Sequence, residues 1–147
     1  MPKRRILVPF DPEQLERIEA FRRRHRLPTR VAAIRALIDA GAANQDPLAR
    51  ALRALQASKA ELERRGVARI GVFGSLARGE ADVASDVDVL VLFAPSRVPD
   101  LFGFLRLRDD IGGIIRKATG REAEIVEAES LRPRIRRAAE ADAVYAF

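Results

Sequence analysis

The spacing of hydrophobic residues changes several times along the chain, and each change separates one predicted element from the next. Side chains alternate between the two faces of a strand, whereas the faces of a helix repeat every 3.6 residues. Short apolar runs bounded by turn residues predict strands at residues 4–10, 67–73, 86–93 and 121–127. Apolar residues three or four positions apart predict helices at residues 12–25, 29–41, 46–65, 101–117 and 131–140. This order favours an α+β fold in which helices flank a mixed β-sheet.

An Asp-Pro pair stands at two of the predicted helix starts, and the second pair marks a domain boundary. Asp11 and Asp46 are each suited to accept hydrogen bonds from the N–H groups of the first helical turn. The proline that follows is tolerated there, because the first turn of a helix leaves its N–H groups unpaired. Asp46 comes after Gly41, which is expected to end the preceding helix. We therefore expect two domains, residues 1–44 and residues 45–147.

Composition narrows the classes of function. The chain has no cysteine and one histidine, His25, which argues against disulfides, thiolate metal sites and histidine-based triads. It has neither an apolar run of membrane-spanning length nor a secretory signal, so we expect a cytoplasmic protein. Of the net charge of +6, residues 1–44 carry +5, from ten Lys/Arg and five Asp/Glu. This asymmetry favours contact between the first domain and a polyanion, and a solvated basic face is the alternative.

The first domain is too small to bury a core alone, because it has one strand and two helices in 44 residues. A second copy would pair the two strands and pack four helices around them. Residues 2–43 resemble the ribbon–helix–helix DNA-binding domains in this pattern. The resemblance implies a homodimer that presents Arg5 and Leu7 to the major groove and holds a phosphate near Thr29 and Arg30. A leucine side chain cannot hydrogen-bond a base, so a domain that only dimerises is the alternative.

The residues suited to chemistry lie between Gly71 and Phe93. Gly74-Ser75 follows a predicted strand, and there the missing Cβ and the free N–H groups of the turn suit an approaching phosphate. Asp86 and Asp88 are two residues apart on the next strand, so both side chains lie on one face. A cation would relieve their repulsion, and Mg²⁺ prefers such oxygen ligands. Each feature alone is most often an ordinary turn or a solvated pair.

The joint pattern is more specific. Gly-Ser-x-Ala-Arg-Gly, followed by Ser-Asp-x-Asp and an apolar strand, resembles the minimal nucleotidyltransferases of the DNA polymerase β superfamily. The resemblance covers about residues 46–147. It implies that Gly74 and Ser75 bind the nucleotide triphosphate. Arg78 either adds charge stabilisation there or has a structural role.

The same resemblance implies a carboxylate metal site. In the family, two strand aspartates and a third carboxylate bind two Mg²⁺ ions, and the first two correspond to Asp86 and Asp88. Glu124 occupies the third position, in a strand of the family's pattern but with Glu in place of Asp. An ordinary surface glutamate on an edge strand is the alternative for Glu124. Leu76 stands where family members often carry arginine, which removes one expected phosphate contact.

The resemblance also implies a function. Few residues follow Glu124, so no further domain is expected to hold an acceptor, and the acceptor is expected to be another macromolecule. In the family this partner is often a HEPN toxin, which the nucleotidyltransferase neutralises as an antitoxin. We expect Mg²⁺-dependent transfer of AMP from ATP to such a toxin, with DNA binding by the first domain as a means of repression. A catalytically silent binding antitoxin or repressor and a small-molecule nucleotidyltransferase are the alternatives.

Overall fold

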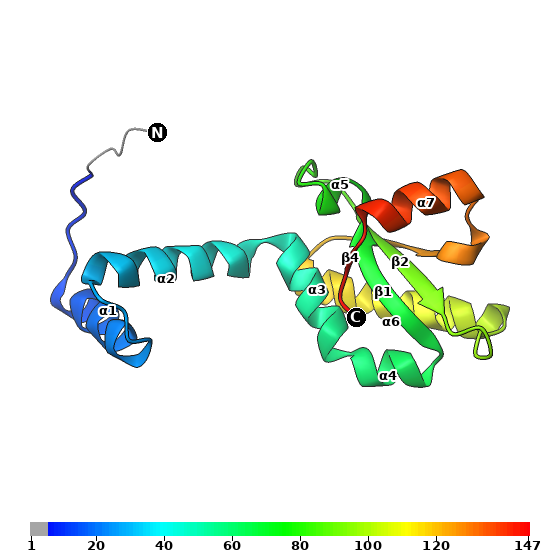
Figure 1. Ribbon diagram of the computed structural model, residues 1–147, viewed down its shortest axis with the longest axis horizontal. Coiled ribbons are helices and arrows are strands. Elements are labelled where there is room, and N and C mark those ends of the chain that lie inside the picture. Colours follow the sequence, from blue (N-terminus) through cyan, green and yellow to red (C-terminus); the bar gives the residue numbers. More distant parts are fainter. Residues whose placement is uncertain (1–5) are drawn as a thin grey trace. The chain divides into compact units, whose positions relative to one another are not determined.

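The computed structural model describes residues 6–147 of the chain (Figure 1). The chain divides into two compact units, Met1–Asn44 and Gln45–Phe147. Among the described helices, none combines the length and the hydrophobicity that spanning a membrane requires. All the residues predicted to bind nucleotide or metal lie in the second unit.

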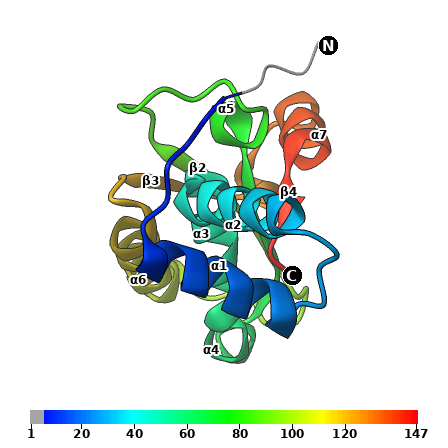
Figure 2. The ribbon, with the colours of Figure 1, turned by 90° about the vertical axis from the view of Figure 1, so that its left-hand side faces the viewer.

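The first unit contains two helices, α1 (Pro12–Arg24) and α2 (Arg30–Gln45). Figure 2 looks along α2 and shows α1 running across it. Asp11 caps α1 as predicted, because its carboxylate accepts the Gln14 N–H at 2.7 Å while its own N–H donates to the Gln14 side chain at 3.1 Å. The predicted end of α2 at Gly41 is wrong. Gly41 does not adopt the left-handed conformation that ends a helix, and α2 continues to Gln45.

The strand predicted for residues 4–10 does not form over residues 6–10 in this single chain. A strand needs a hydrogen-bonded neighbour, and residues 6–10 have none in the part of the chain that the structure describes. Residues 4 and 5 lie outside the described residues. The ribbon–helix–helix domain is therefore not shown by the structure, and it stays a prediction.

The second unit is a mixed four-stranded sheet flanked by helices, which confirms the predicted α+β class. The strands are β1 (Val67–Phe73), β2 (Val87–Phe93), β3 (Ala123–Glu127) and β4 (Val144–Tyr145), in the order β3-β2-β1-β4. The helices are α3 (Pro47–Ala57), α4 (Lys59–Arg64), α5 (Gly74–Ala77), α6 (Leu101–Thr119) and α7 (Pro133–Asp142), with a 3₁₀ turn η1 (Ala128–Ser130). β2 runs antiparallel to β1 and parallel to β3, and β4 pairs antiparallel with β1.

The two faces of the sheet have different surroundings. Val87 and Val89 of β2 are fully buried in the main core, to which α3 and α6 contribute. Leu90 points the other way and packs with Ala139 of α7. Burial of each such side chain stabilises the fold by about 1.5–3 kcal/mol. Because side chains alternate along a strand, Asp88 lies on the same face as Leu90, away from the main core.

Some helix boundaries in the second unit also differ from the predictions. The single helix predicted for residues 46–65 is divided at Ser58, whose ψ of 6° ends α3 before α4 begins. Asp46 still starts this region as predicted, because its carboxylate accepts the Leu48 N–H at 3.0 Å. The last helix begins at Pro133 rather than at Leu131, since proline is well suited to the first helical position.

The C-terminal residues form an edge of the sheet. The Ala146 N–H donates to the Ile70 carbonyl at 2.8 Å, and the Ile70 N–H donates to the Phe147 carbonyl at 3.1 Å. Gly71 allows this close pairing, because a Cβ there would lie 2.7 Å from the Val144 carbonyl oxygen. The last residues therefore fix the outer side of β1, the strand that leads directly into Gly74.

Candidate functional site

Sheet register brings two of the predicted carboxylates side by side. Asp88 of β2 pairs with Glu124 of β3 in the parallel ladder. Asp86 precedes β2 by one residue and alternates with Val87, whose side chain is fully buried in the main core. Ile125 likewise belongs to the main core, which leaves its neighbour Glu124 on the opposite face. The sheet therefore places Asp88 and Glu124 on one face, and Asp86 directly precedes the same strand.

The electrostatics of Asp88 agree with this arrangement. Its side chain is partly buried, whereas Asp86 and Glu124 are exposed. Burial raises the pKa of Asp88, the negative charges of Glu124 and then Asp86 raise it further, and Arg78 acts weakly in the opposite direction. Three carboxylates that repel one another in this way form a set of hard oxygen donors, and a Mg²⁺ ion would offset their charge.

The side chains are not arranged as a finished metal site. Among residues 6–147, no group of three or more His, Cys, Asp or Glu side chains is placed so that it could hold a metal ion. The sheet pairs Asp88 with Glu124, and Asp86 lies near enough for its charge to act on Asp88. The donor set fits Mg²⁺ in its chemistry, and metal binding by these residues stays a prediction.

Gly74 lies against this carboxylate cluster. It follows the last residue of β1, has a φ of +71° and is the first residue of the four-residue helix α5. A Cβ at position 74 would collide with Oδ2 of Asp88. Glycine is therefore required twice here, for the left-handed backbone and for the close approach. Ser75 follows, and its carbonyl accepts the Glu80 N–H at 2.9 Å, which folds the chain back over the turn.

Leu76 follows Ser75 and stands where the family pattern often has arginine. Leu76 is only 8% exposed and belongs to the main core. Its side chain anchors the short helix α5 to that core through apolar contact. A leucine in this place supplies packing and no phosphate contact.

Arg78 is held by two carboxylates. Its Nε donates to Glu80 at 2.8 Å and its Nη1 to Asp142 at 2.6 Å. These bonds raise the pKa of Arg78, with the Glu80 bond as the larger cause. Asp142 is the last residue of α7, so Arg78 links the Gly74-Ser75 turn to that helix. The geometry supports the structural role for Arg78, and contact with a nucleotide stays a prediction.

The loop before β2 is held by contacts beside the candidate site that the sequence pattern did not predict. The Asp82 carboxylate accepts the Ala84 N–H at 2.9 Å and the Ser85 hydroxyl at 3.0 Å. These bonds lower the pKa of Asp82, with the Ser85 hydroxyl as the largest cause. Arg121 donates to two carbonyls of the same loop. Asp-x-x-Ser is a recognisable turn signal, but nothing local in the sequence points to an arginine so far along the chain.

The predicted DNA-binding residues are in varied surroundings. Arg5 lies outside the described residues, and Leu7 is 98% exposed. Thr29 caps α2, because its hydroxyl oxygen accepts the Ala32 N–H at 3.1 Å. Arg30 forms an ion pair with Glu19, which holds the pKa of that carboxyl below its usual value. The structure therefore gives Thr29 and Arg30 local structural roles, and DNA contact by any of the four is untested.

Comparison with known proteins identifies the second unit. Residues 55–146 match the family described as the nucleotidyltransferase domain. The chain belongs to the nucleotidyltransferase family. The matched segment contains Gly74, Ser75, Asp86, Asp88 and Glu124. Residues 1–44 lie outside it.

Individual relatives agree with this family. The nucleotidyltransferase is 40% identical over 92 residues to the protein adenylyltransferase MntA of Thermococcus cleftensis, a match that spans 62% of this chain and 87% of the relative. It also matches a solved minimal nucleotidyltransferase with 37% identity and a TM-score of 0.50, over 63% of this chain and 90% of the other. A toxin–antitoxin structure with AMP-PNP aligns at 19% identity and a TM-score of 0.46, over 63% of this chain and 72% of the other.

Proposed function

We propose that this nucleotidyltransferase transfers AMP from ATP to a hydroxyl group of a protein partner. The observation that carries the proposal is the pairing of Asp88 with Glu124 across β2 and β3, directly beside Gly74. Membership of the family and 40% identity to a protein adenylyltransferase support the reaction type. The acceptor hydroxyl would give up its proton to water, and its oxygen would form a bond to the α-phosphorus of ATP while the bond from that phosphorus to the bridging oxygen breaks and pyrophosphate leaves.

Each site residue has a proposed role. Gly74 and Ser75 would hold the phosphates of the leaving pyrophosphate, through the close approach that a glycine backbone permits. Asp86, Asp88 and Glu124 would hold two Mg²⁺ ions. Bound there, the ions would offset the charge of the triphosphate and lower the pKa of the attacking hydroxyl. Asp88 would be the central ligand, because it is the least exposed of the three, pairs with Glu124 in the sheet and follows Asp86 by two residues.

We further propose that the acceptor is a toxin of the HEPN type and that the nucleotidyltransferase acts as its antitoxin. The motif around Gly74-Ser75 and Asp86-x-Asp88 is that of antitoxin-type minimal nucleotidyltransferases, and this likeness supports the proposal. An antitoxin that acts only by binding is the second candidate. It is favoured by the exposed position of Glu124 and by the absence of a three-residue metal arrangement in residues 6–147.

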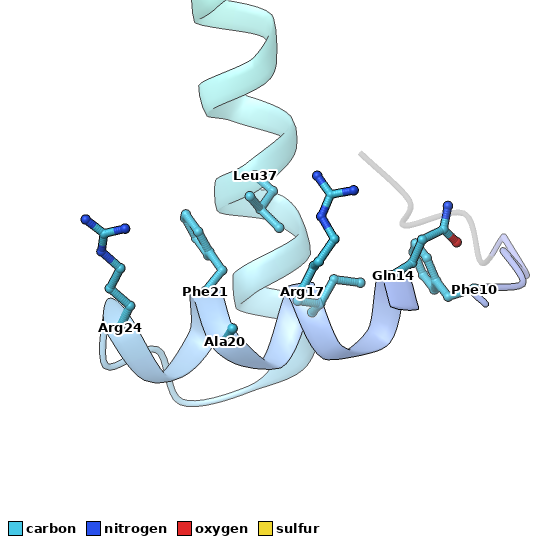
Figure 3. Close-up of a pocket in the computed structure, with 8 residues that line it drawn as sticks. Phe10, Gln14, Arg17, Ala20, Phe21, Arg24 and Leu37 are labelled. Atoms are coloured by element: carbon cyan, nitrogen blue, oxygen red, sulfur yellow. The ribbon is translucent and has the colours of Figure 1, made fainter. Parts of the chain in front are cut away.

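The first unit is proposed to form a homodimer of the ribbon–helix–helix type. Several apolar side chains of the first unit are exposed to solvent. Leu7 and Ile38 are among them, and Ile38 is 63% exposed. A groove of about 510 Å³ opens between α1 and α2, where Figure 3 shows Phe21 and Leu37 with Arg17 beside them. A second copy is the proposed occupant of this apolar surface, because pairing of residues 6–10 with their copy would supply the missing strand neighbour.

The same dimer is proposed to bind DNA. Residues Arg5, Leu7, Thr29 and Arg30 would face the DNA, and the net charge of +5 on residues 1–44 supports contact with a polyanion. Repression of the operon that encodes toxin and antitoxin would be the purpose of this contact.

AMP transfer is tested by incubating the purified nucleotidyltransferase with its protein partner, ATP and Mg²⁺. The mass of the partner is then measured by mass spectrometry. The proposal predicts that the mass of the partner increases by one AMP group. This increase should be absent with the Asp88→Asn variant and present with the Asp109→Asn variant. Asp109 is the matched control, because it is exposed on α6 and pairs with its neighbour Arg108. Neutralisation of the partner without labelling would favour the binding antitoxin. Transfer of AMP to a small molecule alone would favour the small-molecule enzyme.

A further inference from the structure

The side chain of Arg121 reaches from the segment just before β3 to the loop before β2. Its Nη1 donates to the Asp82 carbonyl at 2.5 Å and to the Ser85 carbonyl at 2.8 Å. One nitrogen therefore ties together both ends of a four-residue loop. A hydrogen bond from a charged donor is about twice as strong as one between neutral groups, so this contact is suited to fixing the loop.

The backbone of Arg121 is itself fixed from the side of α6. The helix ends at Thr119, and Gly120 follows with a left-handed φ of +73°. The Thr119 hydroxyl accepts the Arg121 N–H at 3.1 Å and donates to the Ile115 carbonyl at 2.8 Å. The guanidinium thus extends from an anchored position, and the loop is held against the end of a packed helix.

The loop side is anchored in the same way. Asp82 and Ser85 bond to each other through side chain and backbone, with the Asp82 N–H donating to the Ser85 hydroxyl oxygen at 3.0 Å. Asp86 follows directly after Ser85, whose carbonyl Arg121 holds. Just beyond Asp86, the Val87 N–H donates to the Glu122 carbonyl at 2.9 Å. The position of Asp86 is therefore set between two contacts to the segment around Arg121.

The three carboxylates differ in how their backbones are held. Asp88 and Glu124 are fixed to each other by the sheet register. Asp86 lies outside β2, so the ladder does not fix it. Arg121 is three residues before Glu124 in sequence and holds the residue before Asp86. It is thus a direct side-chain link between the segments that carry Asp86 and Glu124.

We propose that Arg121 is a positioning residue that places Asp86 relative to Glu124 and thereby sets the affinity of their site for a divalent cation. The inference rests on the proposed function of those carboxylates. Arg121 acts through the backbone of the loop and touches neither metal nor nucleotide. Loss of a residue that orients metal ligands typically costs about 10- to 100-fold in metal affinity.

Two readouts test the inference in the full chain, with Arg121→Ala, Arg121→Lys and the control Arg116→Ala. Arg116 lies in the last turn of α6, and it bonds to the Glu122 side chain and not to the loop. The first readout is hydrogen exchange of the Ala84 and Ser85 amides in metal-free protein. We expect these amides to exchange about 10-fold faster or more in Arg121→Ala, because the loop opens more often without the hydrogen bonds from Arg121. Their exchange rates should be unchanged in Arg116→Ala.

The second readout is Mn²⁺ binding measured by calorimetry in the presence of a non-hydrolysable ATP analogue. We expect the affinity to fall about 10- to 100-fold in Arg121→Ala, less in Arg121→Lys, which keeps the charge on a shorter arm, and not at all in Arg116→Ala. The lysine variant keeps the test valid if the alanine variant fails to fold. Wild-type exchange rates or wild-type affinity in both Arg121 variants would overturn the role of Arg121. Absence of Mn²⁺ binding in the wild type would instead overturn the proposed function.

Discussion

Gly74 lies so close to Asp88 that a Cβ at position 74 would collide with the Asp88 carboxylate, and the preceding residue, Phe73, pairs with Asp88 across β1 and β2. The turn proposed to hold phosphates is therefore pressed against the central residue of the proposed metal site. The proposed nucleotide-binding turn and the proposed metal site are therefore adjacent, so a substitution in one is expected to affect the other.

Gly74→Ala is predicted to reduce both stability and AMP transfer. The left-handed φ of +71° costs an alanine about 1–2 kcal/mol, and the collision with Asp88 adds to that cost. The measurement is urea unfolding together with the transfer assay. Gly79→Ala is the matched control, because Gly79 has a φ of +73° but open space around its missing Cβ. Equal losses of stability in the two variants would show that the contact with Asp88 is unimportant.

Asp88→Asn is predicted to stabilise the metal-free protein at neutral pH. The folded-state pKa of Asp88 is raised, so the protein favours the protonated form and loses stability as pH rises through that pKa. Asparagine carries no charge, so the variant does not lose stability through ionisation at this position. We therefore expect its melting temperature to be about 1–4 °C higher. Thermal unfolding without metal at pH 7 measures the change, and the gain should shrink at acid pH. A lower melting temperature for Asp88→Asn at pH 7 would contradict the electrostatic account.

Ile38→Glu is predicted to convert a dimer into a monomer. Ile38 is exposed on α2 and lines an apolar groove of about 370 Å³ together with Val8 and Phe10. A buried, unpaired carboxylate in a dimer interface would cost several kcal/mol. Light scattering after size exclusion measures the mass, and Ala40→Glu, which is also exposed on α2, is the control. A wild-type chain that is monomeric at micromolar concentration would refute the proposed homodimer.

Glu19→Gln is predicted to strengthen DNA binding. Glu19 pairs with both Arg22 and Arg30, so its removal frees two cations for phosphate contacts. Binding to duplex DNA, measured across a range of salt concentrations, should become tighter and more salt-dependent. Glu13→Gln makes the same change in net charge in the first turn of α1 and serves as the control. Equal effects of the two substitutions would mean that only the net charge matters.

Local patterns in the sequence were sufficient to predict several strands and helix starts and the family of the second unit. The bounds of β1 were predicted correctly, and the Asp-Pro pairs at Asp11 and Asp46 do start helices, because caps and alternation are set by neighbouring residues. The site motif predicted the family correctly, since Gly74-Ser75 and Asp86-x-Asp88 are each continuous in sequence.

Features that depend on distant residues were not predictable in the same way. Arg121 and its loop partners are 36 and 39 residues apart, and only the fold brings them together. Periodicity alone did not locate the break at Ser58, because the apolar spacing continues through it. The N-terminal strand is a different case, since its predicted neighbour belongs to a second copy and a single chain cannot show it.

Titration of Mn²⁺ into the protein with a non-hydrolysable ATP analogue tests the central claim most directly. The claim is that Asp86, Asp88 and Glu124 form one metal–nucleotide site. It predicts saturable binding in the wild type, at least 10-fold weaker binding in Asp88→Asn and Glu124→Gln, and unchanged binding in Asp109→Asn. Binding that is absent from the wild type, or that survives both site substitutions, would contradict it.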